Sequence, residues 1–171
     1  MKLVKTILTA AVIAVASVCV EAQDLKFAHI NSQKFLAELP EFAQAQQQLQ
    51  DEAKKLEDQM TVMQNELQQK FQEYANKRDS LPELIRATKE KELQDTQARI
   101  QSFQQLAQQS LSQKEQQLMA PILDKYQKAL DEVGKENKFI YIFDTTSQVI
   151  LYTSEQSTDA APLVKVKMTG K

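Results

Sequence analysis

The central part of the chain carries apolar residues at a helical period. From residue 49 to residue 74 the apolar positions follow one another at steps of three or four, which places them on one face of a helix. They are Leu49, Ala53, Leu56, Met60, Met63, Leu67, Phe71 and Tyr74. A strict heptad would place its apolar residue at Lys70 instead of Phe71, so the pattern predicts an irregularity there.

A second helical stripe follows, and its large apolar residues are sparse. It consists of Leu84, Ile85, Leu93, Ile100, Phe103, Leu106, Ala107, Leu111 and Leu118. No glycine occurs from residue 41 to residue 133, and proline begins or ends helices. Pro40, Pro82 and Pro121 therefore predict two arms of equal length, 41–79 and 82–120. We expect a long antiparallel helical hairpin over 41–120 that turns near 79–82.

Residues 25–39 have a strand pattern followed by the pattern of a short helix. Residues 25–30 alternate apolar and polar side chains, with Leu25, Phe27 and His29 on one face. Asn31 and Ser32 are favourable N-cap residues for a helix that we expect to end at Leu39.

The C-terminal part predicts two further strands between two helices. Residues 122–133 carry a dense apolar stripe, which Gly134 is expected to end. Residues 139–143 are apolar on both faces, as in a buried strand, and 149–152 form a second run. Turn residues separate the two runs, so 139–153 is predicted to be a β-hairpin. A short final helix is expected near 162–168.

The predicted fold class is α+β, mostly α, with the long hairpin projecting from a small β-containing body. The body combines residues 24–40 with 121–168. Three strands leave open edges, and a domain of this size without disulfides is only marginally stable alone. We therefore expect self-association into a homo-oligomer. The residues predicted to build this oligomerisation body are Phe27, Ile30, Ile140, Ile142, Val149 and Leu151.

Residues 1–22 have the pattern of a cleaved secretory signal. Lys2 and Lys5 precede an apolar run over 7–20, and small residues near Ala22 offer a cleavage site. The alternative is a lipoprotein with Cys19 as the lipidated residue, although Val18 fits that site poorly. If residues 1–22 are removed, the remaining chain has no cysteine and depends on packing or assembly for its stability.

Composition and chemistry argue against an enzyme, a cofactor, a metal site and a nucleic-acid partner. Without Lys2, Lys5 and Glu21 the chain has 19 basic and 22 acidic residues, a net charge of −3, and no concentrated basic surface. Gly134 and Gly170 are the only glycines, so no glycine-rich phosphate loop exists. His29 is the only histidine, and we expect it to be a partly buried strand residue.

Methionine and aromatic side chains suit a pliable surface for unfolded protein clients. The candidate client-binding residues are Met60, Met63, Leu67, Phe71, Tyr74, Leu81, Leu84, Ile85 and Phe103. The alternative, which we favour for the stripe as a whole, is that these residues form the seam between the two arms. Leu81, Leu84 and Ile85 at the tip are the better functional candidates, since two helices cannot cover every side chain at their turn.

The order of these features resembles the Skp/OmpH family of periplasmic chaperones. A signal segment, a strand with the sequence Phe-Ala-His-Ile over 27–30, a long glutamine-rich hairpin and a strand over 139–144 support the resemblance. It implies a homotrimer in which three helical tentacles surround a cavity. It also implies an ATP-independent holdase that keeps unfolded outer-membrane proteins soluble in the periplasm.

The tentacle charge departs from the family's basic character. Residues 64–100 hold seven basic and seven acidic residues, so membrane or lipid contact through the tentacles is possible but not supported by their charge. A second hypothesis from the residues is a structural coiled-coil adaptor of the cell envelope that docks one folded partner. The holdase is the leading hypothesis, because it accounts for the long sparse hairpin, the oligomer-forming body and the family resemblance.

Overall fold

The computed structural model describes residues 25–147 and 149–170. Its elements are β1 (Lys26–Ile30), α2 (Ser32–Ala37), α3 (Pro40–Lys77), the 3-10 turn η1 (Arg78–Ser80), α4 (Glu83–Asn137), β2 (Phe139–Asp144), β3 (Thr158–Asp159) and α5 (Ala161–Thr169). The predicted signal segment 1–22, with Cys19, lies outside the described residues. Among the described helices, none has the length and apolar character needed to cross a membrane.

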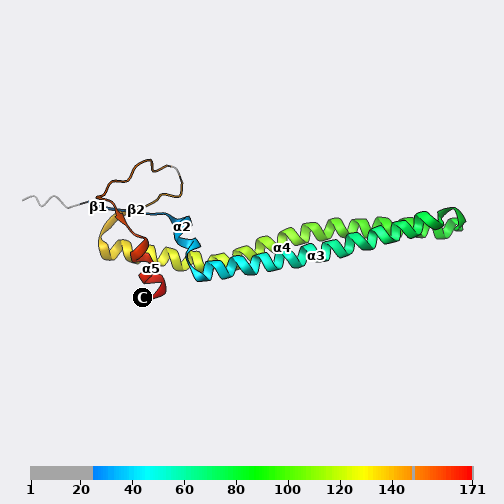
Figure 1. Ribbon diagram of the computed structural model, residues 1–171, viewed down its shortest axis with the longest axis horizontal. Helices are drawn as coiled ribbons and strands as arrows, with labels where there is room; N and C mark the ends of the chain where they lie inside the picture. The colour runs from blue at the N-terminus through cyan, green and yellow to red at the C-terminus, as the bar shows by residue number, and fades with distance from the viewer. Residues whose placement is uncertain (1–24, 148, 171) are drawn as a thin grey trace, which may run out of the picture.

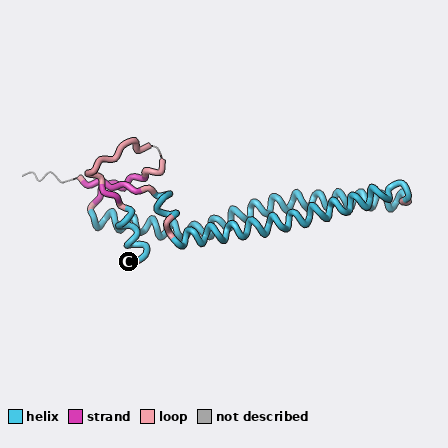
Figure 2. The backbone as a smooth tube through the Cα atoms, viewed as in Figure 1, coloured by secondary structure: helices cyan, strands magenta, loops and turns pink. Residues whose placement is uncertain are grey.

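The long helices α3 and α4 run antiparallel and project from a small body where both ends of the described chain meet (Figure 1). Figure 2 shows that the strands are confined to this body. The predicted α+β, mostly α fold with a long helical hairpin is confirmed. The helices are separated by η1, and Pro82 occupies the N-cap position of α4, as expected from its missing amide donor.

Helix α4 is longer than the sequence predicted, because neither Pro121 nor Gly134 ends it. Pro121 lies inside the helix, and α4 continues to Asn137. The lost backbone hydrogen bond is outweighed by packing on either side, since Leu118 contacts the core and Ile122 is buried in it. Lys138, in the left-handed conformation with φ 57°, provides the C-cap that turns the chain into β2.

The predicted β-hairpin over 139–153 is wrong. β1 is the central strand of a three-stranded sheet, and β2 and β3 both pair with it in parallel. A hairpin is antiparallel, so the chain leaving β2 must instead return across the sheet to the opposite edge. Residues 149–153 belong to this crossover and form no strand. The third strand is the short β3, immediately before the predicted final helix, which is confirmed as α5.

The core lies in the body, where the inner face of the sheet packs on α4 and α5. Ala28 and Ile30 of β1 are buried with Val133 of α4 and Val164 of α5. Phe35 of α2 stacks on Tyr126 of α4, with ring centroids 5.5 Å apart. Sequence positions about a hundred residues apart therefore share one core, which explains why the body needs both chain ends.

The hairpin is held by a narrow seam between α3 and α4. Most of the predicted stripe on α3 is half-buried there, but Phe71 is 58% exposed and Lys70 takes the half-buried seam position. The predicted irregularity is thus a polar residue inside the seam and an aromatic residue outside it. On α4 the buried seam residues are Thr96 and Ile100.

Candidate binding and assembly surfaces

The outer face of the sheet exposes a cluster of aromatic rings. Side chains alternate along a strand, so Phe27 points away from the core when Ala28 and Ile30 point into it. The Phe27 ring stacks with Tyr141 and Phe143 of β2 at centroid distances of 6.4 and 6.3 Å. Their exposed fractions are 38, 60 and 39%. An exposed apolar cluster of this kind is a candidate interaction surface.

The other predicted body residues divide between the core and this surface. Ile30 is buried in the chain's own core, and Ile142 is half-buried against it, so both stabilise the sheet from within. Ile140 is exposed on the edge strand β2. Val149 and Leu151 are almost fully exposed in the crossover, at 78 and 92%. The outer sheet face, the edge strand and the crossover therefore all expose apolar side chains to solvent.

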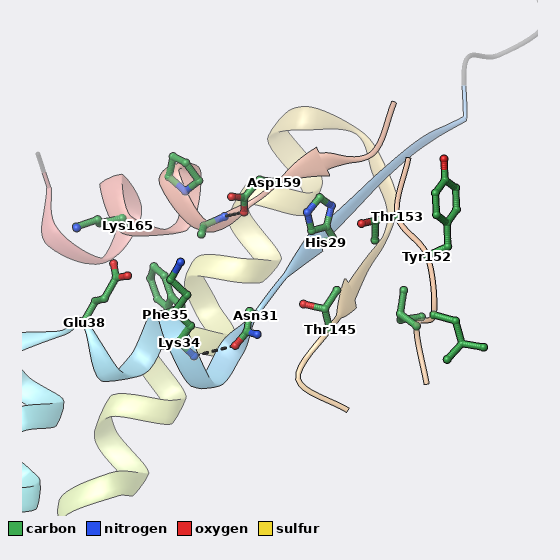
Figure 3. Close-up of a pocket in the computed structure, with 14 residues that line it drawn as sticks. His29, Asn31, Lys34, Phe35, Glu38, Thr145, Tyr152, Thr153, Asp159 and Lys165 are labelled. Carbon is green, nitrogen blue, oxygen red and sulfur yellow. Dashed lines mark hydrogen bonds between the residues drawn. The ribbon is translucent and has the colours of Figure 1, made fainter. Parts of the chain in front are cut away.

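A cavity of about 750 Å³ lies at the side of the sheet, between this crossover and the helices α2 and α5 (Figure 3). His29, Tyr152, Thr153 and Asp159 line it (Figure 3). His29 is half-buried, as predicted, and its Nδ1 is 2.9 Å from the hydroxyl oxygen of Ser157. Within residues 25–147 and 149–170, no cluster of three or more His, Cys, Asp or Glu side chains could hold a metal ion.

The middle of the hairpin has a groove of about 690 Å³ along one side of the seam, which we call the mid-hairpin groove. Met63 and Phe103, two of the predicted client-binding residues, line it together with the 63% exposed Leu106. The groove is completed by Gln59, Asp95, Ala98, Arg99 and Ser102. One acidic and one basic residue flank an apolar floor, so the groove has no dominant charge.

At the tip of the hairpin, apolar side chains are left uncovered. Leu84 is 78% and Ile85 43% exposed, whereas Leu81 is half-buried and lines a cavity of about 210 Å³ between the arms. In the same region the Tyr74 hydroxyl donates a hydrogen bond to Glu90, which raises the pKa of Tyr74. The remaining candidates Met60 and Leu67 are half-buried in the seam.

Charged side chains on the hairpin pair with one another. Lys70 lies 2.7 Å from Glu66, and this hydrogen bond lowers the pKa of the Glu66 carboxyl. Arg99 of α4 approaches the same carboxylate at 3.8 Å. Lys89 and Glu92 form a further pair at 2.8 Å. These charges are balanced locally as well as in total, which leaves apolar and uncharged polar groups as the distinctive features of the hairpin surface.

Sequence reasoning missed two residues of the hairpin and misplaced a third. Thr96 was not assigned to the seam because threonine is polar; its hydroxyl is satisfied by donating to the Glu92 carbonyl oxygen at 2.8 Å. Val62 is 66% exposed and lies three residues after Gln59 of the mid-hairpin groove. The sequence does contain a sign of this, because Val62 is an apolar residue that lies off the helical stripe of the seam. Leu106 was placed in the stripe but is mainly exposed.

Comparisons with known proteins agree on one family. The family model OmpH, described as outer membrane protein (OmpH-like), matches residues 26–168. The fold is similar to the crystal structure of a protein from Caulobacter crescentus described as a candidate outer membrane chaperone (OmpH-like). The TM-score is 0.73 at 12% sequence identity, and the match covers 85% of each chain. No curated protein matches this sequence.

Proposed function

Because this chain belongs to the OmpH-like family, we propose that it is an ATP-independent holdase chaperone of the periplasm that binds unfolded outer-membrane proteins. The observation that carries the proposal is the helical hairpin, which projects far from the body and leaves Leu84, Ile85 and Leu106 exposed. A protrusion with dispersed apolar side chains can hold a flexible chain through many weak contacts.

The proposed assembly is a homotrimer that forms through the body. The stacked rings of Phe27, Tyr141 and Phe143 are an apolar surface that a second copy can cover, and β2 presents an open edge. Closed rotational symmetry would then place three hairpins around a common space. In this proposal the signal segment 1–22 directs the chain to the periplasm.

The proposed client contacts are in the mid-hairpin groove and at the tip. In the groove, Met63 and Phe103 offer an adaptable apolar floor. At the tip, Leu84 and Ile85 are uncovered because the turn has no partner helix beyond it. Contacts at two levels of the arm would let one client bind at several points.

The test is light scattering of an outer-membrane β-barrel protein diluted from urea, with and without the purified mature chain. We expect suppressed aggregation at a stoichiometric amount of assembled chaperone and no requirement for ATP. A Leu84→Ser/Ile85→Ser variant should suppress less, whereas the matched control Val166→Ser, at a 53% exposed position of α5, should behave like the wild type. Unimpeded aggregation with the wild-type chain would refute the holdase proposal.

The same purified chain can be used to distinguish the holdase from the structural adaptor. A structural adaptor would bind one folded envelope protein tightly and saturably, and it would leave generic unfolded chains to aggregate. A pulldown from native and from denatured envelope proteins distinguishes the two, because a holdase retains proteins mainly from the denatured sample.

A further inference from the structure

One row of side chains on α4 belongs to none of the surfaces described above. Six glutamines recur at every fourth residue, and all six are exposed. They are Gln97, Gln101, Gln105, Gln109, Gln113 and Gln117, and we call them the glutamine row. A neighbouring row adds the exposed residues Gln104, Gln108, Ser112 and Gln116. The glutamine side chains that hydrogen-bond within the described part of the chain, Gln47 and Gln127, lie elsewhere.

Helix propensity alone does not account for this row. Glutamate, lysine and arginine form helices as well as glutamine does, and they favour solubility. Nevertheless, residues 100–113 contain no charged side chain, although charged residues make up 26% of the chain. An exposed helix surface that is polar and uncharged over this length fits a partner that is itself polar and uncharged.

We propose that the glutamine row binds an extended segment of unfolded polypeptide through the backbone of that segment. This inference rests on the proposed holdase function and specifies how a client is held. A glutamine side chain carries an amide group with both donors and an acceptor, the same groups that a peptide unit offers. Contacts to the backbone are independent of the client's sequence, as a chaperone with many clients requires.

The spacing of the row matches an extended chain. Four residues of helix rise about 6 Å, and because a row of i, i+4 positions is inclined by about 26° to the helix axis, successive glutamines are about 6.7 Å apart along it. Backbone groups on one edge of a β-strand recur every two residues, or about 6.6 to 6.8 Å. Successive glutamines can therefore meet successive peptide groups on one edge without losing register.

The length of the row also matches. From Gln97 to Gln117 the helix rises about 30 Å, which corresponds to about 33 Å along the inclined row. This is the length of about ten residues of strand. A strand that spans the outer membrane has about 9 to 11 residues. Each step of four residues also turns the row by about 40° around the helix axis, so a strand bound along the whole row must coil around α4 with it.

The first experiment changes Gln101, Gln105, Gln109 and Gln113 together to alanine. Alanine keeps the helix, because it has the highest helix propensity. The matched control changes Gln44, Gln46, Gln48 and Gln50 to alanine, four exposed glutamines of α3 that do not form a single row. We expect the row variant to bind an unfolded outer-membrane protein about tenfold more weakly, because several exposed hydrogen bonds are lost at once. The control variant should bind like the wild type.

A second experiment tests for backbone recognition. A ten-residue peptide of alternating threonine and valine is compared by NMR titration with the same peptide N-methylated at alternate residues, which removes the donors of one edge. The wild type should prefer the unmethylated peptide about fivefold or more, and the row variant should bind both equally. Equal binding of both peptides by the wild type would overturn the inference.

The outcomes separate this inference from the proposed function. If the wild type suppresses aggregation and the row variant binds the client equally well, the glutamine row is not a binding surface, although the chain is a holdase. If the wild type does not suppress aggregation, the holdase proposal itself fails. A soluble cell-wall glycan fragment is the third probe. Glycan binding that is lost in the row variant, without peptide binding, would assign the row to a polysaccharide and overturn the inference.

Discussion

Tyr126 lies where α4 meets α2, with its ring against Phe35. It is 8% exposed, and its hydroxyl oxygen has no hydrogen-bond partner among the described residues. Burial raises the pKa of Tyr126 to about 12, and the nearby charge of Asp144 acts in the same direction. A buried hydroxyl without a partner costs free energy, so the ring stabilises the body and the hydroxyl does not.

The variant Tyr126→Phe should therefore be as stable as the wild type or more stable by up to about 1 kcal/mol. Tyr126→Ala, the control for the ring, should lose about 3 kcal/mol or more. Urea unfolding at pH 7 measures both. The raised pKa also means that the wild type loses stability relative to Tyr126→Phe as the pH rises from about 10 to about 12. A loss on removing the hydroxyl at pH 7 would contradict this account.

Asp144 connects the end of β2 to the start of α2. Its carboxylate accepts hydrogen bonds from the Ser32 amide at 3.2 Å, the Ser32 hydroxyl at 2.5 Å and the Thr146 amide at 2.9 Å. Partial burial on its own raises the pKa of this group, but the hydrogen bonds from Ser32 and Thr146 outweigh burial and lower the pKa to about 2. The ionised form is therefore the stabilising one.

Replacing Asp144 with asparagine should lower the free energy of unfolding by about 1 kcal/mol at pH 7, because exposed charge-assisted hydrogen bonds are lost. The folded pKa is depressed, so the contribution is complete above about pH 4 and is lost as the pH falls to about 2. The difference between wild type and variant should thus disappear in acid. A difference in urea midpoint that persists at pH 2 would rule out the carboxylate as its source.

At the scale of the element, α4 tolerates two residues that usually end helices. Gly134 lies inside the helix, and a Cβ atom there would meet only the Ile142 side chain, at 3.8 Å, which is an ordinary contact. Glycine in a helix interior is less stable than alanine. Alanine at position 134 would therefore be more stable than glycine. Gly170 differs, because it caps α5 with φ +69°.

Gly134→Ala should raise the free energy of unfolding by about 0.5 to 1 kcal/mol. The matched control Gly170→Ala should lower it by about 1 kcal/mol, because a left-handed conformation is unfavourable for alanine. Thermal unfolding of the two variants under identical conditions provides the measurement. Destabilisation by Gly134→Ala would indicate that the space beside Ile142 is filled in the assembled protein.

Lys70 is a charged residue at a half-buried position of the otherwise mainly apolar seam of the hairpin. The ion pair between Lys70 and Glu66 is exposed and contributes little, and the position itself is half-buried between the arms. Lys70→Leu should stabilise the distal half of the hairpin by about 1 kcal/mol. Hydrogen exchange of residues 63–77 should slow about fivefold, whereas Gln72→Leu, at an exposed position, should leave exchange unchanged. Unaltered exchange in Lys70→Leu would show that Lys70 does not limit the packing.

At the scale of the whole molecule, the body exposes apolar side chains that its own fold does not cover. Phe27 and Tyr141 point away from the core, so replacing both with serine should leave the fold of a single chain intact. We expect the sedimentation mass of this double variant to fall to that of one chain. Val62→Ser/Leu106→Ser, at exposed positions of the hairpin, should keep the assembled mass. Assembly that survives in the Phe27/Tyr141 variant would place the interface elsewhere.

The sequence by itself determined the elements whose signal is local. A helical period over 49–74, a turn before Pro82 and an alternating strand before Asn31 all follow from contacts between near neighbours, so α3, η1, β1 and α2 could be predicted. The sequence also predicted that the tip is exposed and the stripe half-buried, because side chains at the turn of a two-helix hairpin have no further helix to pack against. Leu84 and Ile85 illustrate this.

Only the tertiary structure decided the features that depend on distant partners. Pro121 stays helical because the core on either side of it holds α4, and 149–153 is not a strand because β1, far away in sequence, pairs with β2 and β3 in parallel. Lys70 replaces Phe71 in the seam because the opposite helix sets the register. In each case a local preference was smaller than the free energy of packing against residues that the local pattern cannot identify.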